Sequence, residues 1–404
     1  MIRWMAAALA AGMALAPHVA GGQVRTQGAA EALVQDAATY AAVAGIAPAE
    51  ALRQLRAQAD LPPVAQALAT EFAGRLAGIA VEHRPAYGLA VLLTGDEPVP
   101  GRLVQAGGTA VPITFRTGAT ATREGLLAAL TAHQADLRAA LAHPPGMGVD
   151  PRTGTLAVLV SPADAIAEPP PAMAARLSAI SGVPVSIRVL GQEDADMTGT
   201  VEGGGRVTGI NPADGRRYAC TTGFTVTDGT RLGVVTAAHC PDALSYAEPG
   251  TGTVPLDFVG QWGWGYQDVQ VHATALALDP GFFADTAKTL ARSVTGARAR
   301  AETLAGDVVC HRGERTGYSC AEVVLTDFAP AGDLCGGACL PTWVAVQGPG
   351  CRGGDSGGPV FLGSTAYGIV KGGSYRADGR CGFYYYMSVD YLPAGWSLLR
   401  TPQP

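Results

Sequence analysis

All eight cysteines of this chain lie between Cys220 and Cys381, and the first 219 of its 404 residues contain none. An even number of cysteines confined to one region is typical of a disulfide-bonded domain that matures in an oxidising compartment. Eight cysteines allow about 105 sets of pairings, so their number alone does not give the connectivity. We therefore expect a cysteine-free first half followed by an exported, disulfide-bonded second half.

Clustered cysteines can also bind structural zinc, but such sites need close Cys and His pairs at finger-like spacing. Only Cys335 with Cys339, and Cys310 with His311, come near that spacing in this sequence. Disulfide bonding is therefore the stronger prediction, and we expect neither a metal nor a cofactor.

The distribution of charge excludes several classes of partner. The 13 basic and 16 acidic residues before Gly199, and the 15 and 18 from Gly199 onward, leave each part with a net charge of −3. Neither part has the basic surface that nucleic acid requires. The only lysines are Lys288 and Lys371, so a lysine-rich membrane-binding tract is absent as well.

Residues 1–22 have the pattern of a secretory signal peptide. Arg3 precedes the 12-residue apolar stretch Met5–Ala16, and the small residues Ala20 to Gly22 follow it. A stretch of this length is too short to span a bilayer. We therefore predict export through the general secretory pathway to the periplasm or the medium, without a stable membrane span.

The cysteine-free part, residues 23–197, has the pattern of a mixed α/β domain. Its alanine-rich beginning, residues 29–78, is interrupted by prolines at positions 48, 62 and 63, which predicts three short helices. Leucines at helical spacing then predict one amphipathic helix, and apolar runs predict strands. The leucines are Leu126, Leu130, Leu137 and Leu141, and the strands are 87–93, 111–115, 156–160 and 183–190.

The second part has a different composition. The acidic, glycine-rich stretch Gln192–Gly205 is expected to be an exposed connection. Beyond it lie all the cysteines and four of the five tryptophans, among short apolar or β-branched runs separated by turn residues. This pattern predicts an antiparallel β architecture, either a barrel or a sandwich.

Two segments of the second part carry most of the chemical information. In Val234–Cys240, with the sequence VVTAAHC, a strand runs into a turn that presents His239. In Cys351–Pro359, with the sequence CRGGDSGGP, glycine-rich backbone surrounds Ser356. An alcohol is a weak nucleophile at neutral pH, so acyl transfer needs a base to take its proton and backbone donors for the oxyanion. Either segment alone has a structural explanation, a packed histidine or a glycine-rich hairpin, but together they indicate a nucleophilic serine.

The motifs TAAHC and GDSGGP, in that order, resemble those of the chymotrypsin-fold serine peptidases. The segment Cys310–Cys320 resembles the short disulfide loop of the alpha-lytic protease and streptogrisin branch, and Gly148–Val160 resembles a strand of that branch's large pro-region. The resemblance implies a double Greek-key protease of two six-stranded β-barrels at residues 198–404. It also implies an α/β pro-region at 23–197 that assists folding and inhibits the protease.

Carried over residue by residue, the resemblance implies that His239 is the general base and Ser356 the nucleophile. The backbone N–H groups of Gly354 and Ser356 would form the oxyanion hole, and Asp268 would orient the imidazole and stabilise the imidazolium. Asp268 is chosen because it lies in an alternating, strand-like run, Tyr266–His272, at the family's usual distance after the histidine. The other aspartates considered are Asp242, Asp257, Asp279 and Asp285.

The resemblance also suggests how the cysteines pair. One bond would hold the histidine turn, one the short loop and one the wall of the specificity pocket. The fourth, which departs from the family's pattern, would close a tight surface loop. In that order the pairs are Cys220–Cys240, Cys310–Cys320, Cys351–Cys381 and Cys335–Cys339.

Asp355 directly precedes the nucleophile, and a carboxylate in that place is usually buried and must be paired. The bacterial branch has an arginine partner directly after the first cysteine of the short loop. In this chain His311 holds that place and Arg312 follows, so either could serve, and a freed amino terminus is not favoured as the partner. His272 has the same strand parity as Asp268 and is expected to be a packed structural residue.

Gly368–Gly373 resembles the strand that pairs with substrate backbone, so Lys371, Gly372 and Gly373 are candidate substrate-binding residues. The family commonly has serine at the Lys371 position, where it supports the triad aspartate. Three roles for the lysine stay open: it could perturb that support, point into solvent or favour an acidic substrate group. Gly350 stands where trypsin-like pockets have an acid, so we expect small or apolar side chains before the scissile bond.

We therefore predict a secreted, monomeric serine endopeptidase that is made as a preproenzyme and acts on polypeptides. Its partners would be polypeptide substrates and its own pro-region, with no nucleic acid. Two alternatives remain: a protease-like binding protein without catalysis, for which the lysine beside the triad is the best argument, and an esterase with the same nucleophile. Comparing a peptide with a simple ester as substrate separates the two enzyme alternatives.

Overall fold

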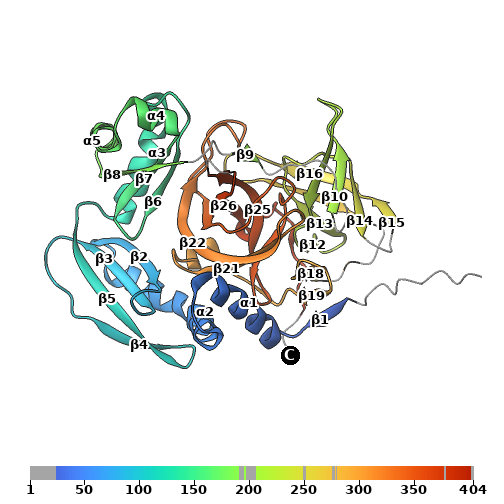
Figure 1. Ribbon diagram of the computed structural model, residues 1–404, viewed down its shortest axis with the longest axis horizontal. Helices are drawn as coiled ribbons and strands as arrows, with labels where there is room; N and C mark the ends of the chain where they lie inside the picture. Colours follow the sequence, from blue (N-terminus) through green and yellow to red (C-terminus); the bar gives the residue numbers. More distant parts are fainter. Residues whose placement is uncertain are drawn as a thin grey trace, which may run out of the picture.

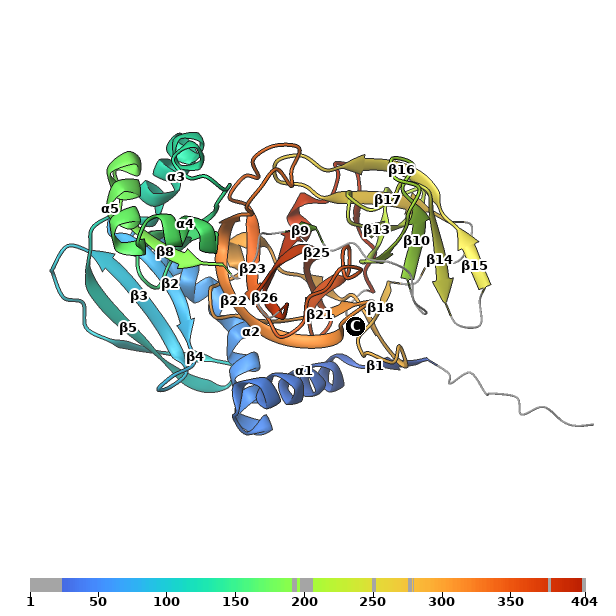
Figure 2. The ribbon, with the colours of Figure 1, turned by 45° about the horizontal axis from the view of Figure 1, so that its top comes forward.

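The computed structural model of the chain describes residues 24–190, 195–196, 206–248, 252–274, 278, 280–376 and 379–401. The predicted signal peptide and most of the predicted connection at 192–205 lie outside these ranges. Two α/β units form the first half of the chain, and two β units form the second half (Figure 1, Figure 2). The predicted fold class, an α/β region followed by a β protein, is confirmed.

In the first α/β unit the second of two helices packs on a four-stranded sheet, while the first helix lies along the barrel of the second half (Figure 1). Its elements are α1 (Ala29–Ala44), α2 (Pro48–Glu71), β2 (Leu76–Glu82), β3 (Gly88–Thr94), β4 (Arg102–Ala106) and β5 (Thr109–Ala119). The strand order is β2-β3-β5-β4, with β3 and β5 parallel. Ala57, Leu61 and Leu68 of α2 are buried together with Val81 and Val91 of the sheet. This apolar contact holds α2 on the sheet.

Helix α2 continues through Pro62 and Pro63, where the sequence predicts a break. The expected three short helices are therefore wrong, and the segment forms two. A proline lacks the N–H that would bond to the carbonyl four residues earlier, so that carbonyl needs another donor. For Pro63 this carbonyl belongs to Ala59, and Nη2 of Arg298 donates to it at 3.4 Å. Leu61, directly before the prolines, is fully buried and packs the helix against the sheet.

The second α/β unit contains the predicted leucine-spaced helix and the strands expected near 156–160 and 183–190. Its elements are α3 (Arg123–Ala139), β6 (Gly146–Asp150), β7 (Thr155–Val160), α4 (Pro162–Ala167), α5 (Pro170–Ser181) and β8 (Val185–Val189). Leu126, Leu130 and Leu137 are fully buried on one face of α3. They pack against Leu156 and Val158 of β7, as the helical spacing predicts.

The first β unit of the second half consists of antiparallel sheets of four and five strands. Its strands are β10 (Arg206–Ile210), β11 (Arg217–Thr221), β12 (Thr225–Thr227), β13 (Leu232–Thr236), β14 (Leu244–Glu248), β15 (Gly252–Pro255), β16 (Asp257–Trp262), β17 (Val269–Ala273) and β27 (Ser397–Leu398). The orders are β11-β10-β14-β15 and β16-β17-β13-β12-β27. Phe224, Val235 and Val271 of this unit are fully buried.

The second β unit is a closed, six-stranded antiparallel barrel. Its strands are β21 (Val308–Gly313), β22 (Gly317–Ala329), β23 (Trp343–Gln347), β24 (Pro359–Leu362), β25 (Thr365–Tyr375) and β26 (Cys381–Ser388). The ring runs β21-β24-β25-β26-β23-β22, and pairing of β21 with β22 closes it. Val309, Val346 and Val370 contribute to its buried interior. The short elements outside the ring are β18 (Gly281–Phe283), β19 (Leu290–Ser293), β20 (Gly296–Ala297), η1 (Arg300–Glu302) and η2 (Val389–Tyr391).

Strand pairing also joins the two halves of the chain. The elements that complete these pairs are β1 (Arg25–Gln27) and β9 (Ala195–Asp196). Strand β1 lies parallel to β19, β6 is antiparallel to β22, and β9 is antiparallel to β25. Through β6 the barrel sheet continues into the second α/β unit, which Figure 2 shows beside the barrel. The first half is therefore built onto the second by backbone hydrogen bonds.

A buried ion pair reinforces this attachment. Asp36 of α1 and Arg292 of β19 are both fully buried, and Nη1 of Arg292 lies 2.9 Å from the carboxylate. The same carboxylate accepts hydrogen bonds from the backbone N–H of Gly363 at 2.6 Å and from the hydroxyl of Tyr318 at 2.5 Å. Because a buried charge is costly without partners, this carboxylate fixes the position of α1 on the second half.

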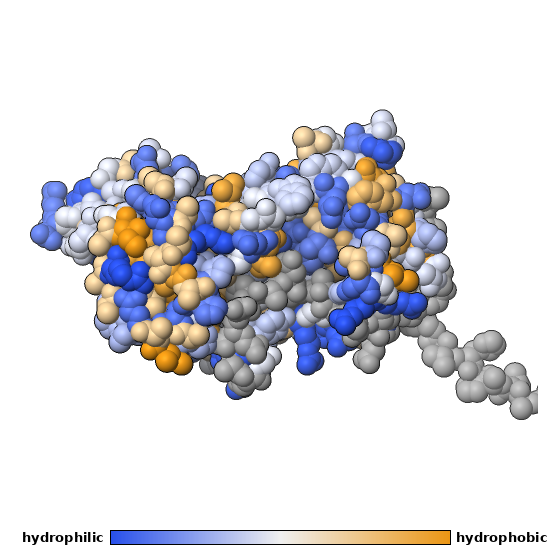
Figure 3. Space-filling model, turned by 90° about the horizontal axis from the view of Figure 1, so that it is seen from above, coloured by the Kyte–Doolittle hydropathy of each residue, from blue (hydrophilic) through white to orange (hydrophobic). Residues whose placement is uncertain are grey.

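Within the described ranges, no helix is both long and apolar enough to span a membrane. The face shown in Figure 3 mixes hydrophilic and hydrophobic residues across both halves of the molecule.

Replacing Asp36 by Asn should destabilise the full-length chain, because Arg292 would keep its buried charge without an anion. Removing one partner of a buried ion pair typically costs about 3–5 kcal/mol. We expect a clearly lower midpoint in urea or thermal unfolding followed by circular dichroism. Glu31→Gln is the matched control on the same helix, because the Arg25–Glu31 pair is about half exposed, with side-chain exposures of 57% and 47%. Equal unfolding midpoints for the two variants would contradict the expectation.

Candidate active site

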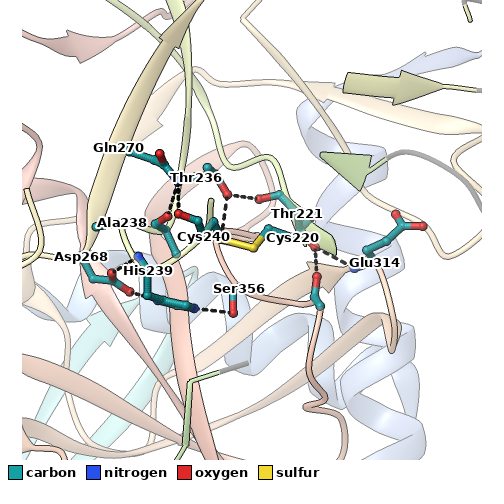
Figure 4. The surroundings of a disulfide bond; sticks show 12 residues. Cys220, Thr221, Thr236, Ala238, His239, Cys240, Asp268, Gln270, Glu314 and Ser356 are labelled. Atoms are coloured by element: carbon teal, nitrogen blue, oxygen red, sulfur yellow. Dashed lines mark hydrogen bonds and ion pairs between the residues drawn. A yellow bond between two sulfur atoms is a disulfide. The ribbon is translucent and has the colours of Figure 1, made fainter. Parts of the chain in front are cut away.

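His239 lies in a turn that strand β13 and a disulfide hold in place. The strand ends at Thr236, and the bond between Cys220 and Cys240 ties the far side of the turn to β11. The side-chain amide of Gln270 on β17 donates to the carbonyls of Ala237 at 2.8 Å and Cys240 at 3.1 Å (Figure 4). The turn is thus held by a strand, a disulfide and a side-chain amide.

His272 supports this arrangement from further along β17. It is fully buried, and burial lowers its pKa to about 4. The ring is therefore neutral at ordinary pH, and its Nε2 lies 3.1 Å from the side-chain oxygen of Gln270. Donation from Nε2–H to that oxygen turns the amide nitrogen toward the histidine turn. The expected structural role of His272 is confirmed.

The structure brings His239, Asp268 and Ser356 together at the boundary between the two β units (Figure 4). Nδ1 of His239 lies 2.8 Å from Oδ2 of Asp268, and the backbone N–H of His239 donates to Oδ1 at 3.1 Å. On the other side of the ring, Nε2 lies 2.9 Å from Oγ of Ser356. Both distances are within hydrogen-bonding range. The imidazole therefore connects a carboxylate from one β unit to a hydroxyl from the other.

Asp268 is ionised although it is almost completely buried, with 2% exposure. Burial opposes its ionisation, but the positive charges of His239 and Lys371 and the hydrogen bonds from His239 outweigh this effect and lower the pKa of Asp268. Nζ of Lys371 lies 3.3 Å from Oδ2 of Asp268. The carboxylate thus has a cationic neighbour besides the histidine.

The position of Lys371 corrects two of the roles left open for it. Its side chain is only 1% exposed, so it does not point into solvent. Because its ammonium group faces Asp268, it is not placed to meet an acidic group of a substrate. For the same reason, the side chain of Lys371 is not placed to bind substrate. Of the three roles, a contact with the triad aspartate is the one that the geometry fits.

Thr221 links the serine loop to the histidine turn. Its backbone N–H donates to the carbonyl of Ser356 at 2.8 Å, and its hydroxyl donates to the carbonyl of Gly354 at 2.7 Å. Its own carbonyl accepts a hydrogen bond from the hydroxyl of Thr236 at 2.8 Å. This one residue of β11 therefore sets how far the serine loop of the barrel stands from the histidine turn (Figure 4).

Asp355 is fully buried and is held by N–H and O–H donors. The backbone N–H groups of Arg315 and Thr316 donate to Oδ1 at 2.8 and 3.1 Å. The hydroxyl of Thr316 and the backbone N–H of Arg352 donate to Oδ2 at 2.7 and 2.9 Å. Consecutive backbone N–H groups form a concave anion site that stabilises a carboxylate without a counter-ion.

The expectation that His311 or Arg312 pairs with Asp355 is therefore wrong. Burial lowers the pKa of His311, and the ring nitrogens lie 3.4 Å from the hydroxyls of Thr316 and Ser319. Arg312 instead pairs with Glu314 at 3.0 Å. The turn that connects β21 and β22 supplies three of the four donors for Asp355, and Arg352 of the serine loop supplies the fourth.

Two glycines make this loop conformation accessible. Gly354 has a φ of +109°, a region that L-residues with side chains rarely adopt. A Cβ at Gly313 would lie 2.1 Å from Oδ1 of Asp355, so only glycine leaves room for the carboxylate there. The predicted oxyanion residues, Gly354 and Ser356, thus belong to a loop whose shape depends on the place of Asp355.

The four disulfides of the structure are the four pairs that the resemblance implies. The bond between Cys335 and Cys339 closes a short loop beside β23, and the carbonyl of Cys335 accepts from the N–H of Gly265 at 3.3 Å. Among the described residues, the one cluster with the spacing of metal ligands is Asp36 with Cys310 and Cys320. Both sulfurs of this cluster are in a disulfide, so it offers no thiolate.

Gly372 and Gly373 form an edge of β25 that pairs with an extended backbone. Gly372 lies opposite Asp196, and Gly373 lies opposite Ala195, in antiparallel register. Just before this edge, the carbonyl of Val370 accepts from the N–H of Gly357 at 2.7 Å in the serine loop. The edge predicted to bind substrate is thus next to Ser356 and is occupied by the end of the first half of the chain.

Sequence reasoning missed the residues that support the site through hydrogen bonds to the histidine turn and the serine loop. Gln270 has the same strand parity as Asp268 and His272, and a glutamine among buried positions of a strand is a signal that could have been used. Thr221 and Thr316 carry no such signal, because their partners Ser356 and Asp355 lie far away in the sequence. Only the fold brings them together.

No family model matches the chain. Similar solved structures include Thermobifida fusca protease A, with 23% identity over 49% of this chain and 98% of that chain and a TM-score of 0.40. Cellulomonas bogoriensis chymotrypsin has 25% identity over 49% and 98%, with a TM-score of 0.38. An alpha-lytic protease homologue, N4, has 22% identity over 47% and 94%, with a TM-score of 0.35. Each of these matches covers about half of this chain, and the roles proposed for individual residues rest on the geometry described above.

Replacing Gly313 by Ala should disable the serine loop, because the added Cβ would displace the Asp355 carboxylate from its donors. Losing one oxyanion donor typically costs about 10²–10³ in rate. We expect a loss of this size in the rate at which a fluorophosphonate labels Ser356. Gly296→Ala is the control, because its Cβ would lie 3.8 Å from the nearest side-chain atom, Oγ1 of Thr365. A folded Gly313→Ala protein that is labelled at the control rate would refute the dependence of the serine loop on the position of Asp355.

Proposed function

We propose that this chain is the precursor of a secreted serine endopeptidase that cleaves polypeptides through an acyl-enzyme. The observation that carries the proposal is the hydrogen-bonded series Asp268–His239–Ser356, with distances of 2.8 and 2.9 Å on the two sides of the imidazole. A serine hydroxyl beside a histidine that a buried carboxylate orients is the arrangement needed for nucleophilic catalysis.

In the proposed reaction, Nε2 of His239 takes the proton of Ser356 while Oγ attacks the carbonyl carbon of the scissile bond. The negative charge that develops on the carbonyl oxygen is stabilised by the N–H groups of Gly354 and Ser356. His239 then gives the proton to the leaving amine, and the C–N bond breaks. Water, deprotonated by the same nitrogen, hydrolyses the ester on Ser356 and restores the serine. Asp268 stays ionised and stabilises the imidazolium.

The edge at Gly372 and Gly373 supports a polypeptide as the substrate. Its antiparallel pairing with residues 195–196 is the contact that an extended substrate backbone would make there. Because backbone pairing of this kind needs consecutive peptide groups, it favours an endopeptidase over an esterase for small esters.

The same pairing supports the proposed division into a signal peptide at 1–22, a pro-region at 23–197 and a protease domain at 198–404. A first half whose end occupies the substrate edge would block the site until it is removed. Its strands also extend sheets of the second half at β6 and β1, which suits a folding template. The four disulfides fit an exported protein, and the mature form is proposed to act as a monomer.

Ser356→Ala should abolish the activity. Removing the nucleophile of such a triad lowers kcat by about 10⁶-fold. We expect secreted wild-type protein to react with a fluorophosphonate and to hydrolyse unfolded casein, and both activities to vanish in the variant. Ser397→Ala removes an exposed serine in β27 and should leave both unchanged. Casein hydrolysis that survives in the Ser356 variant would refute the mechanism.

Two other results would point to the alternatives. A folded wild-type protein that neither labels nor cleaves would support a non-catalytic binding protein. Labelling and ester hydrolysis without cleavage of any peptide would support an esterase.

The mature chain is expected to begin between Thr198 and Val201, which lie outside the described residues. This position follows directly after the residues paired with the substrate edge, so cleavage there would place Met197 or a neighbour at the catalytic serine. Edman sequencing and intact-mass measurement of the secreted protein test the prediction. If the protein processes itself, Ser356→Ala should keep the pro-region attached. A mature amino terminus elsewhere would disprove the predicted boundary.

A further inference from the structure

Lys371 is a buried lysine in direct contact with the site, and no step of the proposed reaction uses it. It lies in the middle of β25, its side chain is 1% exposed, and its Nζ is 3.3 Å from Oδ2 of Asp268. That oxygen is also the one 2.8 Å from Nδ1 of His239. One carboxylate oxygen therefore has two partners, the Nζ of Lys371 on one side and the imidazole on the other.

The surroundings of Lys371 keep its ammonium group in this position. Nζ lies 5.4 Å from the centre of the Trp343 ring, which is fully buried on β23. A cation over the face of an indole ring is attracted by the ring's electrons, and more strongly where water is excluded. The barrel thus supplies an aromatic ring on one side of the ammonium group, and the first β unit supplies Asp268 on another.

The charge balance at Asp268 changes during the proposed reaction. While His239 is neutral, the ammonium of Lys371 already compensates the carboxylate. When His239 becomes an imidazolium, a second cation joins the same oxygen. Asp268 then stabilises the imidazolium less than an uncompensated carboxylate would, and the two cations repel each other. His239 should consequently bind a proton less readily. It should therefore stay neutral, and be able to act as a base, at lower pH.

We infer that Lys371 is a positioning residue that extends the activity of the site toward acid pH by sharing the Asp268 carboxylate with His239. The inference rests on the proposed function, because it concerns the base of that reaction. Its ammonium group contacts Asp268, and the inferred effect on His239 is exerted through that carboxylate.

Other titratable groups in the surrounding elements do not provide this effect. His239 and Lys371 are the charged groups that act on Asp268. On β17, burial holds His272 neutral by lowering its pKa to about 4. On β26, burial raises the pKa values of Tyr384 and Tyr386, so both phenols are neutral. In η2, Asp390 accepts a hydrogen bond from the backbone N–H of Arg300 at 2.7 Å.

The test is the pH profile of kcat/KM for a peptide substrate, together with the pH dependence of fluorophosphonate labelling, on secreted, processed protein. In the wild type, the acid limb of both profiles should have a midpoint below about 6.5, the ordinary value for histidine. In Lys371→Met it should move up by about one pH unit, because Asp268 then acts on His239 uncompensated. Relative activity at pH 5 should fall about tenfold, since one unit is a tenfold change in protonation.

Two variants separate the charge from the packing. Lys371→Arg keeps a cation and should keep the wild-type acid limb. Lys371→Gln keeps a hydrogen-bond donor without the charge and should behave like Lys371→Met, and it carries the test if the methionine variant does not fold. Lys288→Met, which removes the chain's other lysine, should leave the acid limb in place. A merely structural lysine would change stability or the plateau rate but not the midpoint of the acid limb.

The outcomes separate this inference from the proposed function. A wild type that neither labels nor cleaves would overturn the function itself. If the wild type labels and cleaves but the midpoint of its acid limb lies at or above about pH 6.5, only the role of Lys371 would be overturned, whatever the variants do. An active Lys371→Met or Lys371→Gln protein with an unmoved acid limb would overturn it as well.

Discussion

The architecture depends on the compensation of carboxylates that are removed from water. A buried carboxylate is costly unless it is paired, and this chain buries one at each of its structural junctions. Asp36 lies between the two halves of the chain, Asp268 between the two β units, and Asp355 beneath the serine loop. Each of them takes hydrogen-bond donors or a cation from segments distant in the sequence, so each one fixes how separate parts of the chain meet.

The three carboxylates are compensated in different ways, and the differences match their positions. Asp36 has the guanidinium of Arg292, a fixed charge that suits a permanent structural contact. Among the described residues, Asp355 is held by four donors, of which three are backbone N–H groups and one is the hydroxyl of Thr316. Asp268 has the imidazole of His239 and the Nζ of Lys371, and in the proposed reaction the imidazole gains and loses a proton. The proton that moves is thus held by the imidazole between this carboxylate and the hydroxyl of Ser356, while Asp268 itself stays ionised.

The boundary between the β units is held by groups that do not react. Thr221 bonds to both the serine loop and the end of β13, and Gln270 bonds to both ends of the histidine turn. At the boundary between the halves, the side chain of Gln58 on α2 has a similar role. Its amide donates to the carbonyl of Val308 at 3.0 Å and accepts from that residue's N–H at 2.8 Å, as a neighbouring strand would. Short polar side chains that bind backbone therefore set the distances on which the proposed chemistry depends.

Local sequence predicted the residues that meet in the candidate active site, and tertiary structure decided what surrounds them. His239 and Ser356 stand in short motifs, Asp268 follows from strand parity and distance, and the confinement of the cysteines predicted the disulfide-bonded half. His239, Asp268 and Ser356 lie together in the structure, and the disulfides fall in the predicted half, because turn geometry and strand alternation are properties of neighbouring residues. The donors of Asp355, the contact of Lys371 with Asp268 and the continuation of α2 through Pro62 and Pro63 could not be predicted in this way. In each case the deciding partner is far away in the sequence, and only the folded chain places its donor or charge within hydrogen-bonding distance.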